Sequence, residues 1–219
     1  MEKKNKKRLI LGAGLVVAFV LWTILVRFVD VRAIGPEGSS VGFATLNRFV
    51  HGLTGVNWLL YTVTDWLGLV PIAVALGFAI LGLLQLIRRK SLWRVDRSIL
   101  VLGVLYTVIM AVYILFEMIV INYRPTLIDG NLEASYPSST TMLVMCVMPT
   151  AAMQLNVRIK NKVLRRCVSV AIIAFTTCMV IGRLVSGVHW ITDIVGGALF
   201  SVGIVLMYDS IGNKEATRC

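Results

Sequence analysis

His189 and Asp193 have the spacing of a histidine and its partner carboxylate. They are four positions apart in "GRLVSGVHWITD" (182–193), so on a helix they lie on one face. The carboxylate of Asp193 can then accept the ring N–H of His189 and fix the tautomer of the imidazole. The other ring nitrogen is left free to attack, so this pair predicts a nucleophilic histidine.

Two arginines and two serines can supply the groups that bind a phosphate. Arg124 and Arg183 carry forked donors that suit a tetrahedral oxyanion. Ser138 and Ser139 follow Pro137 at an expected helix start, where hydroxyls and backbone N–H groups favour negative charge. Taken singly, each feature is common, because an arginine near a helix end usually reaches lipid headgroups. Their combination predicts a phosphate pocket that contains a nucleophile.

The composition indicates that the chain lies in a bilayer. Of its 219 residues, 58% are hydrophobic and only 15% are charged, and the mean hydropathy is +0.83. A soluble domain of this length does not need so much apolar sequence. The formal net charge of +11 is typical of some nucleic-acid-binding proteins, but here the basic residues form clusters between apolar segments. We therefore expect no nucleic-acid partner.

The apolar segments predict an all-α fold, an integral membrane bundle of six transmembrane helices that forms a single domain over residues 1–219. The first segment follows "MEKKNKKR" without a convincing cleavage site, so we expect an uncleaved span. The segment "NWLLYTVTDWLG" (57–68) mixes aromatic and polar residues and predicts an interfacial helix within an outward loop at 30–65. Segments that meet or approach the length needed to span a bilayer are 9–29, 66–87, 99–121, 139–155, 167–185 and 191–208.

The loop charges predict how the helices are oriented. Three basic segments, "KKNKKR", "RRKSLWRVDR" and "RIKNKVLRR", together with the tail after Asp209, hold 17 of the 22 Lys and Arg residues. By the positive-inside rule, both termini and the two basic loops face the cytoplasm. The connections expected to face outward are therefore 30–65, 122–138 and 186–190.

This orientation places the chemically capable residues at one depth. Arg124, the segment 137–140, Arg183 and His189 all fall at the outward ends of their spans. Ionisable groups at a membrane boundary are costly and mark a functional site by default.

Three segments at these helix ends resemble the motifs of the type 2 phosphatidate phosphatase family, which are integral-membrane relatives of the vanadium haloperoxidases. The family motifs read K-x6-R-P, P-S-G-H and S-R-x5-H-x3-D. Here the corresponding segments, within residues 117–193, are "EMIVINYRP" (117–125), "PSST" (137–140) and "GRLVSGVHWITD" (182–193). The third keeps R-x5-H-x3-D intact, and six spans match the usual topology of the family.

The resemblance implies a helical enzyme that removes phosphate from lipid monophosphates or diphosphates on the outward side of the cell membrane. It makes His189 the nucleophile that forms a phosphohistidine and Asp193 its orienting carboxylate. It makes Arg124, Ser138 and Arg183 the residues that bind the phosphate. It implies no metal and no other cofactor, and the expected partner is a membrane lipid phosphate or diphosphate.

Three positions depart from the family pattern: Glu117 replaces the lysine, Thr140 the second-motif histidine and Gly182 the serine. That histidine is the family's general acid, and such protonation contributes about 10²–10⁴-fold. The alkoxide from a phosphomonoester is about as basic as hydroxide, whose parent water has a pKa of ~15.7, so it needs this proton. A phosphate leaving group has a pKa of only about 6 and departs without it. Thr140 therefore predicts a preference for lipid diphosphates, such as undecaprenyl diphosphate.

Glu117 lies two helical turns before Arg124 and on a similar face. We expect it either to pair with Arg124 or Arg183, or to act as a proton donor if burial raises its pKa. Three other ionisable residues of the outward loops are expected to be solvated: His51, Asp129 and Glu133.

Two other functions stay open. One is a phosphatase of phosphatidate or phosphatidylglycerophosphate that uses an unrecognised acid, for which hydrolysis of monophosphates would depend on Glu117. The other is a non-catalytic member of the family that binds lipid phosphate, or a transporter that uses the same arginine pocket. The sequence carries no signal for the oligomeric state.

Overall fold

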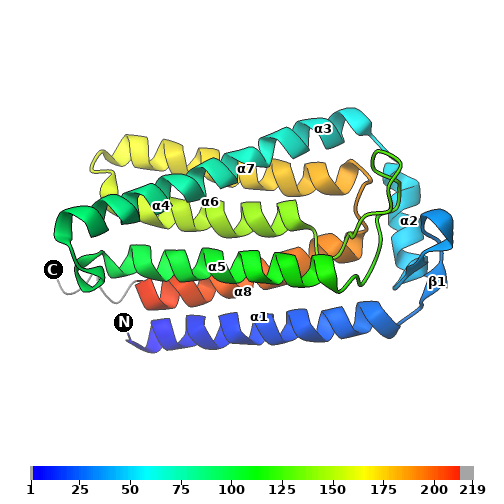
Figure 1. Ribbon diagram of the computed structural model, residues 1–219, viewed down its shortest axis with the longest axis horizontal. Helices are drawn as coiled ribbons and strands as arrows, with labels where there is room; N and C mark the ends of the chain where they lie inside the picture. The colour runs from blue at the N-terminus through cyan, green and yellow to red at the C-terminus, as the bar shows by residue number, and fades with distance from the viewer. Residues whose placement is uncertain (1, 213–219) are drawn as a thin grey trace.

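The apolar segments form long helices in the computed structural model, which describes residues 2–212 (Figure 1). A two-stranded antiparallel hairpin pairs Arg32 with Val41 and Ala33 with Ser40. The elements in chain order are α1 (Glu2–Phe28), β1 (Arg32–Ala33), η1 (Pro36–Gly38), β2 (Ser40–Val41), α2 (Ala44–Thr54), α3 (Trp58–Leu67), α4 (Leu69–Arg89), η2 (Leu92–Arg94), α5 (Arg97–Met118), α6 (Ser139–Arg158), α7 (Lys162–Val185) and α8 (Ile191–Gly212).

The six predicted membrane spans are confirmed, and most of them are longer than their apolar segments. The last three, which are short in the sequence, span 20, 24 and 21 residues because flanking polar residues continue the helices. Within residues 2–212, the stretches long and apolar enough to cross a membrane are Lys3–Phe28, Trp58–Arg89, Arg97–Met118, Ser139–Arg158, Lys162–Val185 and Ile191–Ile211.

Residues 57–68 do not form a separate interfacial helix. They form α3, which Asn57 caps by accepting a hydrogen bond from the backbone N–H of Leu60 at 2.9 Å. Gly68 keeps helical backbone angles (φ −60°, ψ −18°) and donates to the carbonyls of Thr64 and Asp65, so the chain passes almost without a break into α4. Because Gly68 does not end the helix, α3 and α4 together make up the second span.

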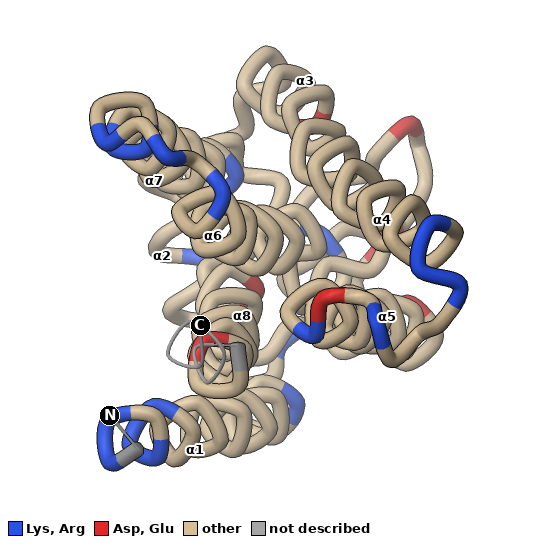
Figure 2. Tube along the Cα trace, turned by 90° about the vertical axis from the view of Figure 1, so that its left-hand side faces the viewer, with Lys and Arg blue, Asp and Glu red and all other residues tan. Residues whose placement is uncertain are grey.

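The two ends of the bundle differ in charge. The start of α1, the end of α8 and the α4–α5 and α6–α7 connections lie at one end, with the hairpin, α2 and residues 119–138 at the other (Figure 1). Lys and Arg residues gather at the first end (Figure 2). This is the arrangement expected from the loop charges, although the basic residues of the tail, Lys214 and Arg218, lie outside the described residues.

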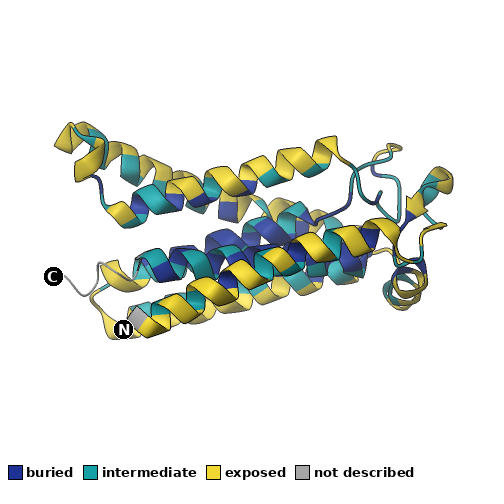
Figure 3. Cartoon of the chain, turned by 90° about the horizontal axis from the view of Figure 1, so that it is seen from below, coloured by how far each residue is buried: buried dark blue, intermediate teal, exposed yellow. Residues whose placement is uncertain are grey.

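Helices α6 and α8 form the centre of the bundle (Figure 2), and the buried residues gather inside it (Figure 3). In their apolar windows 50% and 61% of residues are buried, against 6–22% in the other four spans. Helix α8 packs against α1, α2, α5, α6 and α7. The helix that carries Asp193 is therefore the one with the most neighbours to hold it in place.

Helices α1 and α8 approach closely through two glycines. A Cβ atom on Gly12 would lie 2.6 Å from the carbonyl oxygen of Gly203, and one on Gly203 would lie 2.9 Å from the carbonyl oxygen of Gly12. Small residues at such a contact let two helix backbones meet, which stabilises helix pairs in lipid by van der Waals packing.

This contact predicts that Gly12→Ala destabilises the protein. The added methyl group would press on α8, and overpacking of this kind costs about 1–3 kcal/mol. Gly14 is the matched control, because a Cβ there meets nothing within 4 Å. Gly14→Ala should leave the melting temperature unchanged or raise it, since alanine favours a helix over glycine by roughly 0.5–1 kcal/mol. Thermal unfolding in detergent micelles measures both, and equal melting temperatures would contradict the close packing of α1 on α8.

Candidate active site

The carboxylate of Asp193 lies fully buried in the first turn of α8. Its Oδ2 accepts hydrogen bonds from the hydroxyl of Ser135 at 2.5 Å and from the backbone N–H of Trp190 at 2.8 Å. The backbone N–H of Ser138 donates to the carbonyl oxygen of Asp193 at 3.2 Å. A buried carboxylate is tolerated when hydrogen bonds satisfy it. These contacts therefore join the loop before α6 to the start of α8.

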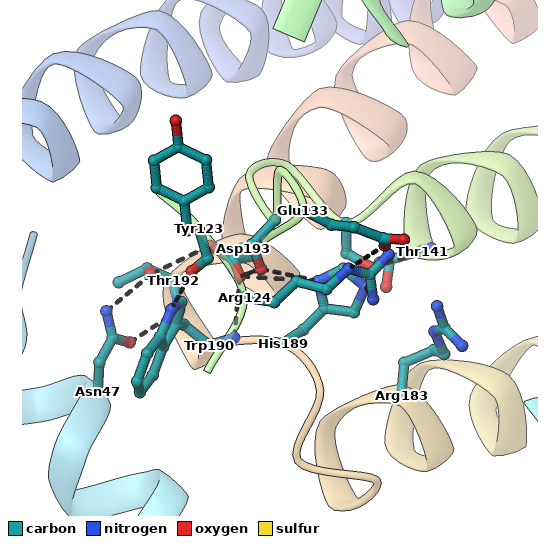
Figure 4. Close-up of polar contacts among 12 residues, drawn as sticks. Asn47, Tyr123, Arg124, Glu133, Thr141, Arg183, His189, Trp190, Thr192 and Asp193 are labelled. Carbon is teal, nitrogen blue, oxygen red and sulfur yellow. Dashed lines mark hydrogen bonds and ion pairs between the residues drawn. The ribbon is translucent and has the colours of Figure 1, made fainter. Parts of the chain in front are cut away.

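His189 is buried beside this carboxylate, in the turn that precedes α8. Its Nδ1 lies 3.1 Å from the hydroxyl of Ser135 and 3.7 Å from Oδ2 of Asp193. Its Nε2 lies 3.4 Å from Nη1 of Arg124 (Figure 4). The structure thus brings together the histidine and aspartate singled out by their spacing, with a serine hydroxyl between them.

Burial lowers the pKa of His189 well below the usual value of 6.5, and the positive charges of Arg124 and Arg183 lower it further. The ring is therefore neutral at ordinary pH. A neutral imidazole has one nitrogen with a free lone pair, which is the form that can act as a nucleophile or a base.

Arg124 is paired with a carboxylate of its own loop. Its Nε lies 3.1 Å from Oε2 of Glu133, and its backbone N–H donates to the Glu133 carbonyl at 3.0 Å. An antiparallel β-bridge between Tyr123 and Ala134 places Arg124 beside Glu133. The expectation that Glu133 is merely solvated is therefore wrong, although 43% of its side chain remains exposed.

Arg183 lies at the end of α7 and is held from α3. Only 1% of the residue is exposed. Its Nη1 lies 3.4 Å from the hydroxyl of Thr64 and 3.5 Å from Oδ1 of Asp65, and its guanidinium carbon lies 5.1 Å from the centre of the Tyr61 ring. Figure 4 shows Arg183 apart from the His189 ring, with Arg124 nearer to it. Helix α3 therefore holds the Arg183 side chain in place.

Gly182, which replaces the serine of the third motif, also packs against α3. A Cβ atom at Gly182 would lie only 2.7 Å from the methyl group of Thr64. The side chain of Thr64 thus takes the space that a serine at position 182 would need, and it offers its own hydroxyl to Arg183.

A small cavity opens beside His189, and Phe116 and Met142 give it an apolar wall. Four of the predicted site residues line it: Glu117, Arg124, Ser139 and His189. Ser135 and Tyr136 line it as well, together with Tyr113, Ala134 and Pro137.

Two other predicted residues have different surroundings. Ser138 is fully buried, and its hydroxyl accepts a hydrogen bond from the backbone N–H of Thr141 at 3.4 Å, so it caps α6. Thr140 lies near the α3–α4 junction, where a Cβ on Gly68 would be 3.7 Å from its methyl group. Neither side chain lines the cavity. Glu117 was expected to form an ion pair with Arg124 or Arg183. Instead, Arg124 pairs with Glu133, and Arg183 pairs with Asp65.

The loop before α6 is anchored by Tyr136. Its ring stacks on Phe19 with centroids 6.3 Å apart, meets Phe116 edge-on at 5.6 Å, and lies so close to Gly196 that a Cβ there would be 2.7 Å away. Its hydroxyl is 2.7 Å from that of Thr23. These contacts with α1, α5 and α8 fix the position of the preceding residue, Ser135.

Helices α1 and α2 support the segment from Gly187 to Thr192. The amide of Asn47 donates to the hydroxyl of Thr192 at 3.0 Å, and the indole N–H of Trp22 donates to its carbonyl at 3.1 Å. Nε2 of His51 lies 3.1 Å from the carbonyl oxygen of Gly187, so His51 is not simply solvated. The N-terminal helices therefore hold the turn that carries His189.

Nothing in the residue pattern singles out Ser135, Tyr136 or the α3 residues. Ser135 and Tyr136 directly precede "PSST", and this adjacency is the one sequence signal that could have found them. Among residues 2–212, no group of three or more His, Cys, Asp or Glu side chains is arranged to hold a metal ion.

The sequence and the fold both match known proteins. Residues 119–215 match the family model of the PAP2 superfamily. The whole fold is similar to the crystal structure of the first transmembrane PAP2 type phosphatidylglycerolphosphate phosphatase from Bacillus subtilis, with a TM-score of 0.61 and 20% sequence identity over 94% of this chain and 96% of that chain. A comparison with curated proteins finds no match. The expected all-α membrane fold is confirmed.

The environment of His189 predicts how it titrates. Because burial and the two arginines disfavour the charged ring, His189 should take up its proton only at a pH below the usual midpoint of 6.5. Nitrogen NMR of ¹⁵N-histidine protein in micelles should therefore show a mainly neutral ring at pH 6.5, where an ordinary histidine is half protonated. The His51→Gln variant leaves His189 as the single histidine and assigns the signal. A midpoint at or above 6.5 in that variant would rule out a buried neutral imidazole.

Proposed function

Because residues 119–215 match the family model of the PAP2 superfamily, we propose that the protein is a membrane lipid phosphatase that hydrolyses a lipid diphosphate through a phosphohistidine at His189. The observation that carries this proposal is the orientation of the His189 ring. Its Nδ1 faces the Ser135 hydroxyl and the Asp193 carboxylate, its Nε2 faces Arg124, and the residue lines the cavity. The nitrogen free to attack is therefore the one beside a phosphate-binding cation.

The reaction begins when a substrate phosphate takes the place of carboxylates at the arginines. Arg124 exchanges Glu133 for the phosphate, Arg183 adds charge from the α7 side, and Ser139 offers its hydroxyl at the start of α6. Nε2 of His189 then forms a bond to phosphorus as the bond to the leaving oxygen breaks, and that oxygen keeps the electron pair. Water hydrolyses the phosphohistidine, which releases phosphate and restores the imidazole.

The surroundings of Thr140 support a diphosphate substrate. Its side chain lies at the α3–α4 junction outside the cavity, so the position of the usual general acid offers no proton. A leaving phosphate, with a pKa of about 6, departs without protonation. A polyprenyl diphosphate such as undecaprenyl diphosphate combines this leaving group with a lipid tail that suits six membrane spans.

The distribution of charge supports an orientation of the protein in the membrane. The site lies at the end of the bundle opposite the clusters of Lys and Arg (Figures 1 and 2). By the positive-inside rule, the basic end faces the cytoplasm, so the site faces the extracytoplasmic side.

Glu117 favours a second candidate, a phosphatase of phosphatidate or phosphatidylglycerophosphate. Its carboxyl group lines the cavity together with Arg124 and His189, where it could protonate an alkoxide. The structural neighbour is itself described as a phosphatidylglycerolphosphate phosphatase. In this reaction Glu117→Gln would remove monophosphate hydrolysis while the diphosphate reaction persisted.

Matched mono- and diphosphate lipids test the first proposal. We expect wild-type protein to release phosphate from the diphosphate, and His189→Ala to lose this activity. Thr140→Ala should leave the diphosphate activity unchanged, because the Thr140 side chain lies outside the cavity. Release of inorganic phosphate measures all three. No phosphate release from any polyprenyl diphosphate at high enzyme concentration would contradict the proposal.

Glu133→Gln should strengthen phosphate binding. Removing a half-exposed ion pair from Arg124, worth about 0.2–1 kcal/mol, frees the guanidinium and should lower the Kd for orthophosphate about 1.5- to 5-fold. Asp129→Asn removes the same charge from an exposed position of the same loop and serves as the control. Calorimetry of both variants measures the effect. An equal gain in both would show that charge alone, and not release of Arg124, is responsible.

A further inference from the structure

A buried serine hydroxyl lies between the nucleophilic histidine and its carboxylate. The Ser135 oxygen is 3.1 Å from Nδ1 of His189 and 2.5 Å from Oδ2 of Asp193. The direct distance from Nδ1 to Oδ2 is 3.7 Å, which exceeds the length of a hydrogen bond. All three residues are buried.

The directions of these hydrogen bonds follow from the number of available protons. A hydroxyl has one hydrogen, and the Asp193 carboxylate can only accept, so Ser135 donates to Oδ2. The remaining lone pairs of the Ser135 oxygen can then accept the N–H at Nδ1 of His189. Nε2 carries no hydrogen in this tautomer, which agrees with its position 3.4 Å from a nitrogen of Arg124, a group that can only donate.

The backbone holds Ser135 at this position from both sides. Its N–H donates to the carbonyl of Asn122 at 2.9 Å, and the neighbouring Tyr136 is packed among aromatic rings of α1 and α5. Three residues later, the N–H of Ser138 donates to the carbonyl of Asp193. The loop and α8 are thus fixed to each other, so the hydroxyl has little freedom to leave the gap.

We propose that Ser135 is a positioning residue for the nucleophile, and that its hydroxyl relays the orienting effect of Asp193 to His189. This role rests on the proposed function of His189 as the attacking group. When Nε2 bonds to phosphorus and the leaving oxygen departs with its electron pair, the ring becomes positively charged. The Nδ1 proton stays on the ring, and the Ser135 hydroxyl, polarised by Asp193, stabilises the charge.

The first test is the tautomer of His189 in the unmodified site, which needs no substrate. Nitrogen NMR of ¹⁵N-histidine protein in micelles, with His51→Gln to isolate the signal, distinguishes a ring protonated at Nδ1 from one protonated at Nε2. We expect the proton on Nδ1. Ser135→Ala should lose the single tautomer, whereas Ser135→Thr, which keeps a hydroxyl, should preserve it. A wild-type ring protonated at Nε2 would overturn the proposal whether or not the variants fold.

The second test is kinetic. Ser135→Ala should lower kcat for diphosphate lipid about 10- to 100-fold with little change in KM, the range seen when a metal-binding histidine loses the partner that orients its ring. Ser210→Ala removes an equally buried hydroxyl of α8, bonded to the carbonyl of Met207, and should leave kcat unchanged. Adding Asp193→Asn to Ser135→Ala should cost little more, because both residues act through one contact. Additive losses would show that Ser135 has only a structural role.

The two tests separate the two proposals. A wild-type ring protonated at Nδ1 that becomes mixed in Ser135→Ala, in a protein that hydrolyses no lipid phosphate, would support the role of Ser135 in holding the ring and refute the proposed function. Normal kcat and an unchanged tautomer in Ser135→Ala, in an active phosphatase, would refute the role of Ser135 and leave the proposed function intact.

Discussion

An ionised carboxylate loses its hydration when it is buried, and the loss must be made good by hydrogen bonds. Asp193 meets this constraint with donors from two separate segments, the Ser135 hydroxyl in the loop before α6 and the Trp190 N–H in the turn before α8. Satisfying one carboxylate therefore sets the distance between two motifs that are more than forty residues apart in the chain. The ring of His189 lies against this assembly, and Arg124 lies against the ring. The geometry of the site follows from the need to bury one charge.

The departures from the family motifs have different structural consequences. At Gly182 the missing side chain leaves room for Thr64, whose hydroxyl reaches Arg183 from α3, so the loss is met by a neighbour. At Thr140 the short side chain lies at the α3–α4 junction, away from the cavity, and the proposed preference for a diphosphate rests on this loss. At Glu117 a carboxylate replaces a cation inside the cavity, while Glu133 and Asp65 pair with the arginines. The effect of each substitution thus depends on what surrounds it.

The six spans could be predicted from the sequence because apolar length is a local property, and their common polar end could be predicted from loop charges. The proximity of His189 and Asp193 was also accessible, because a separation of four positions keeps the two residues close even though His189 lies in the turn before α8. Three features could not be predicted: the bridging position of Ser135, the ion pair of Glu133, and the contacts of Arg183 with α3. They depend on loop conformation and on contacts between residues as far apart as Thr64 and Arg183, for which spacing along the chain gives no signal.

The close contact between α1 and α8 joins the helix made first among the six spans to the one made last. During synthesis, Gly12 of α1 cannot contact Gly203 of α8 until the other spans have been made. Trp22 and Thr23 of α1 contact Thr192 and Tyr136, so the turn that carries His189 lacks part of its support until α8 arrives. The site around His189 is therefore complete only after the last span has been inserted.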